Sequence, residues 1–166
     1  TEQYRNIRNT FKFMLGNIDA SDFNYESDYV KYEELESIDQ YLKVRLAELV
    51  EAVKQAYAHY DFLDVTGLCT SFMTNELSSF YLDIVKDRLY TAGKKSLSRR
   101  ACQTVLYETL HVLVRILAPV MPHQAEDIWQ NTPECQRGGL ESILLADWVG
   151  VNEAWNAPEL EETFAK

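Results

Sequence analysis

The fold is decided by the stretch CQTVLYETLHVLVRILAPVMPHQAEDIW, residues Cys102 to Trp129. Its apolar residues recur at spacings of three and four, which places them on two adjacent stripes of one helix. The first stripe is Leu106, Leu110, Leu113 and Leu117, and the second is Cys102, Val105, Thr109, Val112 and Ile116. Two neighbouring stripes form a face wider than a coiled-coil seam, so we expect this helix to be buried against several others.

Two prolines end this helix. Pro119 and Pro122 have no backbone N–H, and Pro122 also disfavours the helical conformation of Met121. A second helix then begins with Pro122 in its first turn, and we expect Glu126 and Asp127 near the positive end of its dipole. The stretch therefore predicts a central helix with a bent continuation, on which the rest of the chain packs.

Three further segments have helical periodicity. The first covers residues 1–18 and ends at Gly16-Asn17, a usual C-terminal signal. The second runs from Ser37 to about Tyr60, and the third follows a short break at residues 59–62 and continues to about Leu89. Within the third, Ser78-Ser79 either lets another backbone approach closely or caps a bend. Together with the central helix and its continuation, these segments predict an all-α fold with four main helices plus a short fifth.

Length, charge and cysteine content limit the possible functions. The chain has 166 residues, which fits one domain with a sizeable core. A net charge of −10 argues against a free-standing, non-specific nucleic-acid binder but leaves room for local basic patches. Cys69 and Cys102 fall on apolar stripes, so we interpret them as core residues rather than disulfide or zinc ligands. No stretch is apolar and long enough to span a membrane and no signal core is present, so we expect a cytoplasmic protein.

A basic edge on the first predicted helix is the leading candidate site. This edge carries Arg5, Arg8, Asn9 and Lys12, with Phe13 next in the sequence. One interpretation is a solvated helix face with a single stray aromatic residue. The other is a cationic edge with a stacking ring, the combination that single-stranded RNA loops favour.

A second cationic group lies between residues 86 and 100. We expect Ser98 to cap the central helix, which would place Arg99 and Arg100 at its positive end, an unfavourable position unless an anion lies near. The acidic segment 19–36 would share this end of an antiparallel bundle, so charge neutralisation within the chain is one interpretation and RNA binding is the other. The basic residues are Lys86, Arg88, Lys94, Lys95, Arg99 and Arg100.

The sequence contains no recognisable catalytic chemistry. His123 and Glu126 are one helical turn apart, but no third ligand completes a metal site. We place His111 on a polar edge of the central helix, beside Arg115. A glycine-rich phosphate loop, a nucleophile elbow and a paired-cysteine motif are all missing from the sequence.

Several motifs together resemble the anticodon-binding helical domain of class I isoleucyl-tRNA synthetases. They are YRNIRNTFKFMLGNI (residues 4–18), SSFYLDIVKDRLY (78–90), SRRACQTVLYETLHVLVRILAPVMPHQAEDIW (98–129), ESILLADW (141–148) and PELEE (158–162). The AP-x-MPH-x-AE-x-IW element is shared with valyl and leucyl relatives, whereas SSFYLDI-x-KDRLY is closer to the isoleucyl branch. The resemblance covers nearly the whole chain, and it departs at Val149, where the family often has proline, and at Gly150-Val151.

The resemblance implies an up-and-down helical bundle over residues 1–131 and a C-terminal extension over 132–166 that packs on it and leads to a truncated helix starting near Pro158. It also implies a piece of a longer ligase, since the HIGH and KMSKS signatures and the editing domain are missing. The parent enzyme would join isoleucine to its tRNA with ATP and Mg in the catalytic domain, for protein biosynthesis. The piece itself would be non-catalytic, hold no cofactor or metal, bind tRNA, contact the catalytic domain of its own chain, and be a monomer away from membranes.

Transferred to this sequence, the resemblance makes Arg8, Asn9, Lys12 and Phe13 the first candidates for contact with the anticodon stem-loop. Cations there would fix phosphates, the ring would stack on a loop base, and Asn9 would hydrogen-bond a base edge. Lys86, Arg88, Arg99 and Arg100 form a weaker second group. Two alternatives remain open, namely the same role in a valyl- or leucyl-tRNA synthetase, and a helical protein-interaction module without an RNA role.

Overall fold

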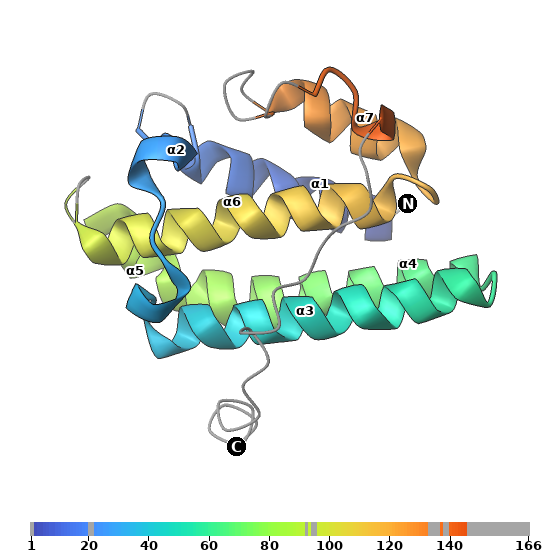
Figure 1. Ribbon diagram of the computed structural model, residues 1–166, viewed down its shortest axis with the longest axis horizontal. Coiled ribbons are helices and arrows are strands. Elements are labelled where there is room, and N and C mark those ends of the chain that lie inside the picture. The colour runs from blue at the N-terminus through green and yellow to red at the C-terminus, as the bar shows by residue number, and fades with distance from the viewer. Residues whose placement is uncertain are drawn as a thin grey trace.

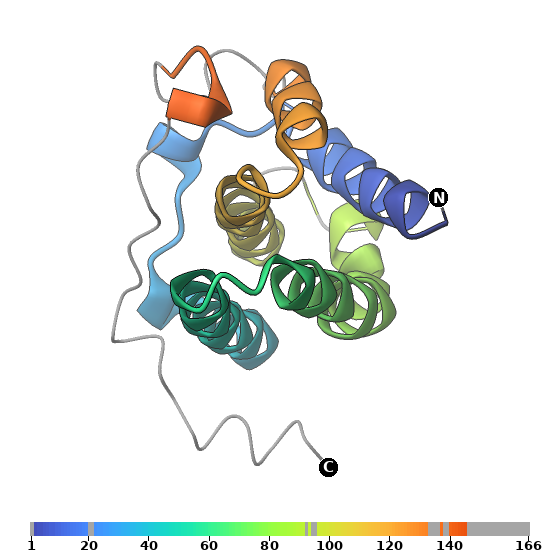
Figure 2. The same ribbon diagram turned by 90° about the vertical axis from the view of Figure 1, so that its right-hand side faces the viewer.

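Helix α6, Leu97–Leu117, runs through the middle of the molecule (Figure 1). The computed structural model describes residues 2–19, 22–91, 93, 96–132, 137 and 140–145. Every residue of the two apolar stripes is buried, as the sequence predicts. Viewed end-on, α6 is enclosed by the other long helices (Figure 2). The described residues contain helices, turns and loops but no strand, which confirms the all-α prediction.

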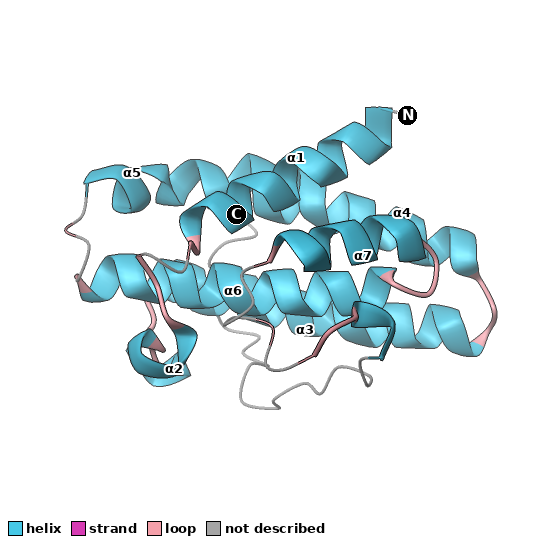
Figure 3. Cartoon of the chain, turned by 90° about the horizontal axis from the view of Figure 1, so that it is seen from above, coloured by secondary structure: helices cyan, strands magenta, loops and turns pink. Residues whose placement is uncertain are grey.

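The helices around α6 form two groups. Below it in Figure 1 lie α3, Ser37–Ala58, and a rod made of α4, Phe62–Ser71, η2, Phe72–Leu82, and α5, Asp83–Thr91. Above it lie α1, Glu2–Asn17, and α7, Pro122–Asn131, which run side by side when seen from above (Figure 3). The short α7 is the fifth helix that the two prolines predict, with Pro122 in its first turn.

The rod α4–η2–α5 was predicted as one helix, but its middle is a π-helix of 11 residues. A π-helix has a wider turn than an α-helix and is uncommon at this length. The chain enters the rod through Tyr60, whose φ of 56° is left-handed, and through Asp61, whose carboxylate accepts the N–H of Asp64 at 3.1 Å. Ile84 fits the apolar spacing of this segment, which predicts that it faces inward, but it is 48% exposed because the π-turns rotate the residues that follow them.

Residues 22–36, here called the acidic strap, connect α1 to α3 across the side of α6. The strap contains the short helices α2, Tyr25–Asp28, and η1, Tyr32–Glu34. It lies on the bundle, because Phe23, Val30 and Leu35 are buried and the backbone N–H of Val30 donates to Thr104 of α6 at 3.2 Å.

Three details at the end of the bundle differ from prediction. His111 is buried rather than on a polar edge, because α7 folds back and places Trp129 edge-on against its ring at 5.2 Å. Glu126 and Asp127 fall in the second turn of α7, since that helix begins at Pro122. The sequence SILLADWV predicts an extended segment from Ser142 to Val149, but residues Ile143–Leu145 form a 3-10 turn, η4.

The C-terminal predictions are tested only in part. Ile143 is buried, and the carboxylate of Glu126 accepts its backbone N–H at 3.1 Å and the hydroxyl of Ser142 at 2.8 Å. The helix expected from Pro158, the departure at Val149 and the third cysteine, Cys135, lie outside the described residues. Among the described helices, none combines the length and apolar character that crossing a bilayer requires.

Candidate nucleic-acid interface

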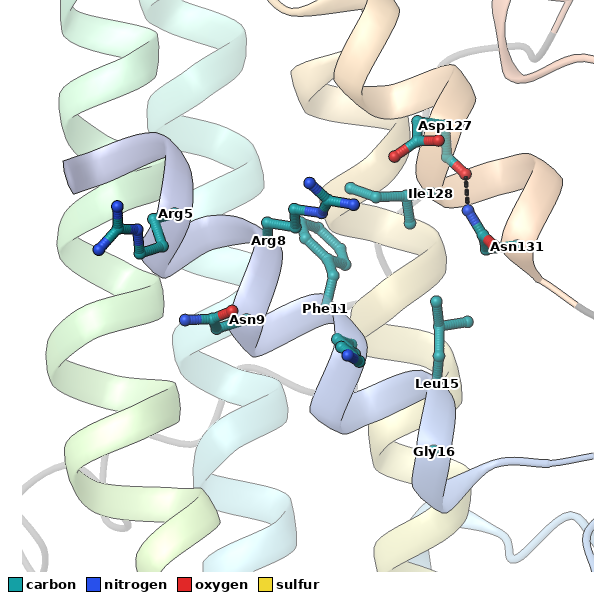
Figure 4. Close-up of a pocket in the computed structure, with 10 residues that line it drawn as sticks. Arg5, Arg8, Asn9, Phe11, Leu15, Gly16, Asp127, Ile128 and Asn131 are labelled. Atoms are coloured by element: carbon teal, nitrogen blue, oxygen red, sulfur yellow. Dashed lines mark hydrogen bonds between the residues drawn. The ribbon is translucent and has the colours of Figure 1, made fainter. Parts of the chain in front are cut away.

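A groove of about 630 Å³ lies between α1 and α7 (Figure 4). Helix α1 lines one wall with cationic and amide side chains, and α7 contributes a carboxylate and an amide to the other. Apolar side chains form its base, among them the buried Phe11 and Ile128. The lining residues are Arg5, Arg8, Asn9, Phe11, Lys12, Leu15, Gly16, Asp127, Ile128 and Asn131.

The cationic side chains of α1 remain available to a ligand. Arg5, Arg8 and Lys12 are exposed, and none of them forms an ion pair with another described residue. Arg8 extends toward α7, whereas Arg5 and Asn9 point away from it (Figure 4). Because positive side chains without an internal partner attract anions, this part of α1 is suited to phosphate.

Phe13 lies on a different edge of α1 from Arg8. Five residues correspond to about 140° around a helix, so the ring does not line the groove with the cations. It is half-buried and packs against the core. Asn9, one turn before Phe13, lies on the outermost part of α1 between the two edges. The first candidate group therefore spans the exposed surface of α1 rather than forming one row.

Arg88, from the second candidate group, binds a buried carboxylate. Its two terminal nitrogens donate to Asp39 at 3.0 and 2.7 Å, and Asp39 is fully buried. The Nε of Arg88 donates to Ser98 at 3.0 Å, and Glu36 lies 3.5 Å from Nη1. Burial alone would lower the pKa of Arg88, but the hydrogen bonds and charge of Asp39 raise it, so this guanidinium stays charged.

The other members of this group also have partners within the chain. Arg99 pairs with Asp22, and Arg100 pairs with Asp28, so the strap supplies the anions that the positive end of α6 requires. Lys86 lies 3.3 Å from Asp83 in an exposed pair on α5. Ser96, not Ser98, caps α6, because the helix begins two residues earlier than expected.

The pairing shifts the ionisation of Asp28. Partial burial alone would raise the pKa of its carboxyl, but the backbone N–H of Asn24 and the guanidinium of Arg100 lower it below its ordinary value. The carboxylate is therefore stabilised in the folded chain, where it accepts the N–H of Asn24 at 2.8 Å. Charge neutralisation between the strap and α6 is confirmed for these arginines, which leaves α1 as the main cationic surface in the part of the chain that is described.

A second internal pair was not foreseen from the sequence. Lys43 of α3 is 1% exposed and forms an ion pair with Glu108 of α6. Tyr25 of the strap donates to the same carboxylate at 2.8 Å, and its ring stacks on Tyr107 at 4.2 Å. Burial and the neighbouring Glu108 raise the pKa of Tyr25, so its hydroxyl stays protonated and continues to donate. These contacts fasten the strap to the bundle.

The described residues contain no cluster of side chains that could hold a metal ion. No group of three His, Cys, Asp or Glu side chains converges among them. Cys69 and Cys102 are buried and free, as predicted, and burial raises the pKa of each thiol to about 12. Such thiols are neutral and unreactive at physiological pH. The exposed cations and amides of α1 can bind anions and hydrogen-bonding groups.

The sequence identified the cations of α1 but not the wall that faces them. Asp127 and Asn131 lie more than a hundred positions later in the chain, and Asn131 donates to the backbone carbonyl of Asp127 at 2.7 Å (Figure 4). Only the turn at Pro119 to Pro122 indicated that this helix would return toward the beginning of the chain. Arg5 was noted on the same face without being included among the candidates.

Comparison with known proteins agrees with this geometry. The family model described as the anticodon-binding domain of tRNA ligase matches residues 39–166. The chain is 44% identical over 164 residues to the isoleucine–tRNA ligase of Natranaerobius thermophilus, covering 99% of the chain and 17% of that relative. It is 43% identical over its full length to that of a Thermoanaerobacter species, of which it covers 18%. It is 46% identical over 147 residues to that of Geobacillus kaustophilus, covering 89% of the chain and 16% of the relative.

The chain spans about a sixth of the length of the relatives that it matches. The family match covers more than half of the chain, and the relatives extend it over α1 and the candidate groove. On this evidence, the chain belongs to the family of anticodon-binding domains of tRNA ligases.

Proposed function

We propose that this chain binds the anticodon stem-loop of an isoleucine tRNA, as part of an isoleucine–tRNA ligase. The relatives are isoleucine–tRNA ligases, which supports the amino acid, and the family supports the RNA element. The catalytic domain of the parent would use ATP and Mg to attach isoleucine in the cytoplasm. Residues 1–131 would contact the tRNA as a monomer, and residues 132–166 would connect this bundle to the next part of the enzyme.

The observation that carries the proposal is the contrast between α1 and the rest of the surface. The chain has a net charge of −10, and the arginines at the start of α6 are paired with the strap. Arg5, Arg8 and Lys12 have no such partner among the described residues. A polyanion approaching this acidic domain would therefore be attracted to α1.

The residues on α1 would make different kinds of contact with the RNA. Arg8 and Lys12 would contact phosphates, which positions the RNA without reading its sequence. Asn9 can donate to and accept from a base edge, and the half-exposed ring of Phe13 can stack on an unpaired base. Lys86 would add a peripheral phosphate contact, whereas Arg88, Arg99 and Arg100 would bind RNA only by giving up their carboxylates.

The test is a titration of the chain with an isoleucine tRNA transcript at two salt concentrations. We expect weak binding by the wild-type chain, with a salt dependence that reflects few phosphates. The double variant Arg8→Glu with Lys12→Glu should bind at least about tenfold more weakly, and the slope of log K against log salt should fall by about 1.4–1.8, or 0.7–0.9 for each lost contact.

The matched control is Lys31→Glu with Lys54→Glu, which changes the net charge equally at two exposed positions outside the groove. This control should retain most of the affinity. Equal losses in both double variants would show that only the overall charge matters. Unchanged affinity in the α1 variant would favour the protein-interaction module instead. A panel of isoleucine, valine and leucine tRNAs tests the choice of RNA.

A further inference from the structure

A second, smaller pocket of about 210 Å³ lies on the other side of α1, between this helix and the rod. Helix α1 lines one wall, and the end of α4 and the π-helical segment η2 line the other. Its volume is below the roughly 300–1,000 Å³ of pockets that enclose drug-sized ligands, so it suits a single ring system. The lining residues are Asn6, Ile7, Asn9, Thr10, Thr70, Met73, Thr74, Ser78 and Ser79.

The chemistry of this pocket is neutral and polar. None of its lining side chains is ionisable, although the chain as a whole is strongly acidic. Asn6, Asn9, Thr74 and Ser79 form no side-chain hydrogen bond within the described residues, so their amides and hydroxyls can bind a ligand. Such groups both donate and accept, which matches the mixed edge of a nucleobase. The buried Ile7 and Met73 provide apolar surface for a ring.

Two hydrogen bonds between α1 and the rod set the distance between the two walls of the pocket. Thr10 of α1 and Ser78 of η2 share a hydrogen bond of 3.1 Å, and Gln3 donates to Thr70 at 2.8 Å. These contacts hold α1 against the rod on both sides of the opening. The serine pair that the sequence left unexplained therefore allows α1 to approach closely, and the π-turn is a feature often found at functional sites.

Asn9 connects this pocket to the cationic groove, because it lines both of them. Arg5 precedes Asn9 by one turn and points to the same side of α1 (Figure 4). Phe13 follows Asn9 by one turn. A nucleotide lying across α1 at Asn9 thus has a phosphate partner on one side and a neutral polar pocket on the other.

We propose that this pocket receives one unpaired base of the RNA loop that crosses α1, with Arg5 and Arg8 binding the adjacent phosphates. The inference rests on the proposed function and adds a base-binding site to it. Base binding here gives α1 a means of distinguishing loops by sequence, which phosphate contacts alone do not supply. Neutral walls favour a base over a phosphate, because a phosphate needs cationic partners and no cationic side chain lines this pocket.

The test fills the pocket in the full chain and uses a synthetic anticodon stem-loop of the isoleucine tRNA as the probe. Ser79→Leu places an apolar side chain at the opening, and Asn75→Leu is the control, an exposed position on the same π-helical segment outside the pocket. We expect Ser79→Leu to weaken binding about tenfold, as loss of one stacked base does, and Asn75→Leu to stay within about twofold. Thr74→Val, which replaces the hydroxyl with a methyl group of similar size, should weaken binding about threefold.

Abasic substitution along the loop identifies the base. Removing the base at one loop position should weaken binding to the wild-type chain about tenfold. The same abasic loop should bind the Ser79→Leu variant as well as the intact loop does, because that variant already excludes the base. If Ser79→Leu and Thr74→Val bind as tightly as Asn75→Leu while Arg8→Glu with Lys12→Glu still weakens binding, the pocket is not a base site and the proposed function stands. If the charge reversals also have no effect, both proposals are wrong.

Discussion

Arg88 of α5 binds the fully buried carboxylate of Asp39 of α3 through both terminal nitrogens, at 3.0 and 2.7 Å. The hydroxyl of Tyr81 donates to the same carboxylate at 2.6 Å. Asp39 therefore has three donors in a place that water does not reach. A buried charge of this kind is tolerated only while its partners remain.

Removing the guanidinium should strongly destabilise the fold. We expect Arg88→Met to lower the free energy of unfolding by about 3–5 kcal/mol, because it leaves the Asp39 carboxylate buried without its countercharge. Lys86→Met is the control on the same helix and should cost less than about 0.5 kcal/mol, since its pair with Asp83 is exposed. Urea denaturation measures both. Equally small losses in the free energy of unfolding for Arg88→Met and Lys86→Met would contradict a buried charge on Asp39 that depends on Arg88.

The pair between Asp28 and Arg100 should make stability depend on pH. The pKa of Asp28 is below its ordinary value of 3.8 in the folded chain, so its carboxylate stabilises the fold fully above the ordinary value. This contribution is lost as the pH falls from about 5 through the lowered pKa. Asp28→Asn should therefore reduce stability at pH 7, with a difference from wild type that disappears in acid.

The matched control for this titration is Asp87→Asn, which removes an exposed carboxylate from α5. The stability of this variant should differ little from that of the wild type at pH 7. Thermal unfolding at a series of pH values measures both variants. If the stability difference between Asp28→Asn and the wild type stayed the same at acid pH, the pairing of Asp28 with Arg100 would be contradicted.

The buried thiols should resist alkylation. Burial raises the pKa of Cys69 and Cys102 to about 12, so almost no thiolate is present at pH 7.5. Peptides containing these residues should stay unmodified after treatment of the native chain with iodoacetamide and become modified in urea. Mass spectrometry of the digest gives the modified fraction for each. Rapid modification of either thiol in the native state would mean that the bundle opens there.

Phe13 should contribute to RNA binding through its ring. Phe13→Leu keeps an apolar side chain against the core and removes the stacking surface, so we expect about fivefold weaker binding of the stem-loop, at the low end for one stacked base. Phe13→Tyr keeps the ring and should bind within about twofold of wild type. Fluorescence anisotropy measures the affinities, and circular dichroism checks that the fold is retained. Equal affinity for both variants would assign Phe13 to packing alone.

The long helices and several of their ends could be predicted because they depend on neighbours in the sequence. The two stripes of α6 appear every three or four residues, and Pro119 and Pro122 act on the residues directly before them. The break at residues 59–62 was placed correctly for the same reason. The π-turns of η2 were not predicted, because the same apolar spacing is compatible with either helical form.

The candidate site was predictable in part. The exposure of Arg8, Asn9 and Lys12 follows from the apolar face of α1, which identifies the opposite face as outward. Their separation from Phe13 also follows from helical geometry, although adjacent numbering suggested a single edge. The second wall of the groove and the neutral pocket required α7 and η2 to be placed in space.

By itself, the sequence determined which long segments are helical, where the central helix ends, which face of that helix is apolar, and that the chain resembles a tRNA-ligase domain. Only the tertiary structure decided which charges are available. Arg88 pairs with Asp39, Arg99 with Asp22 and Lys43 with Glu108 across dozens of positions, while the cations of α1 remain without a partner among the described residues. The physical reason is that side-chain periodicity reports neighbours within one or two turns, whereas Coulomb attraction depends on distances that only packing sets.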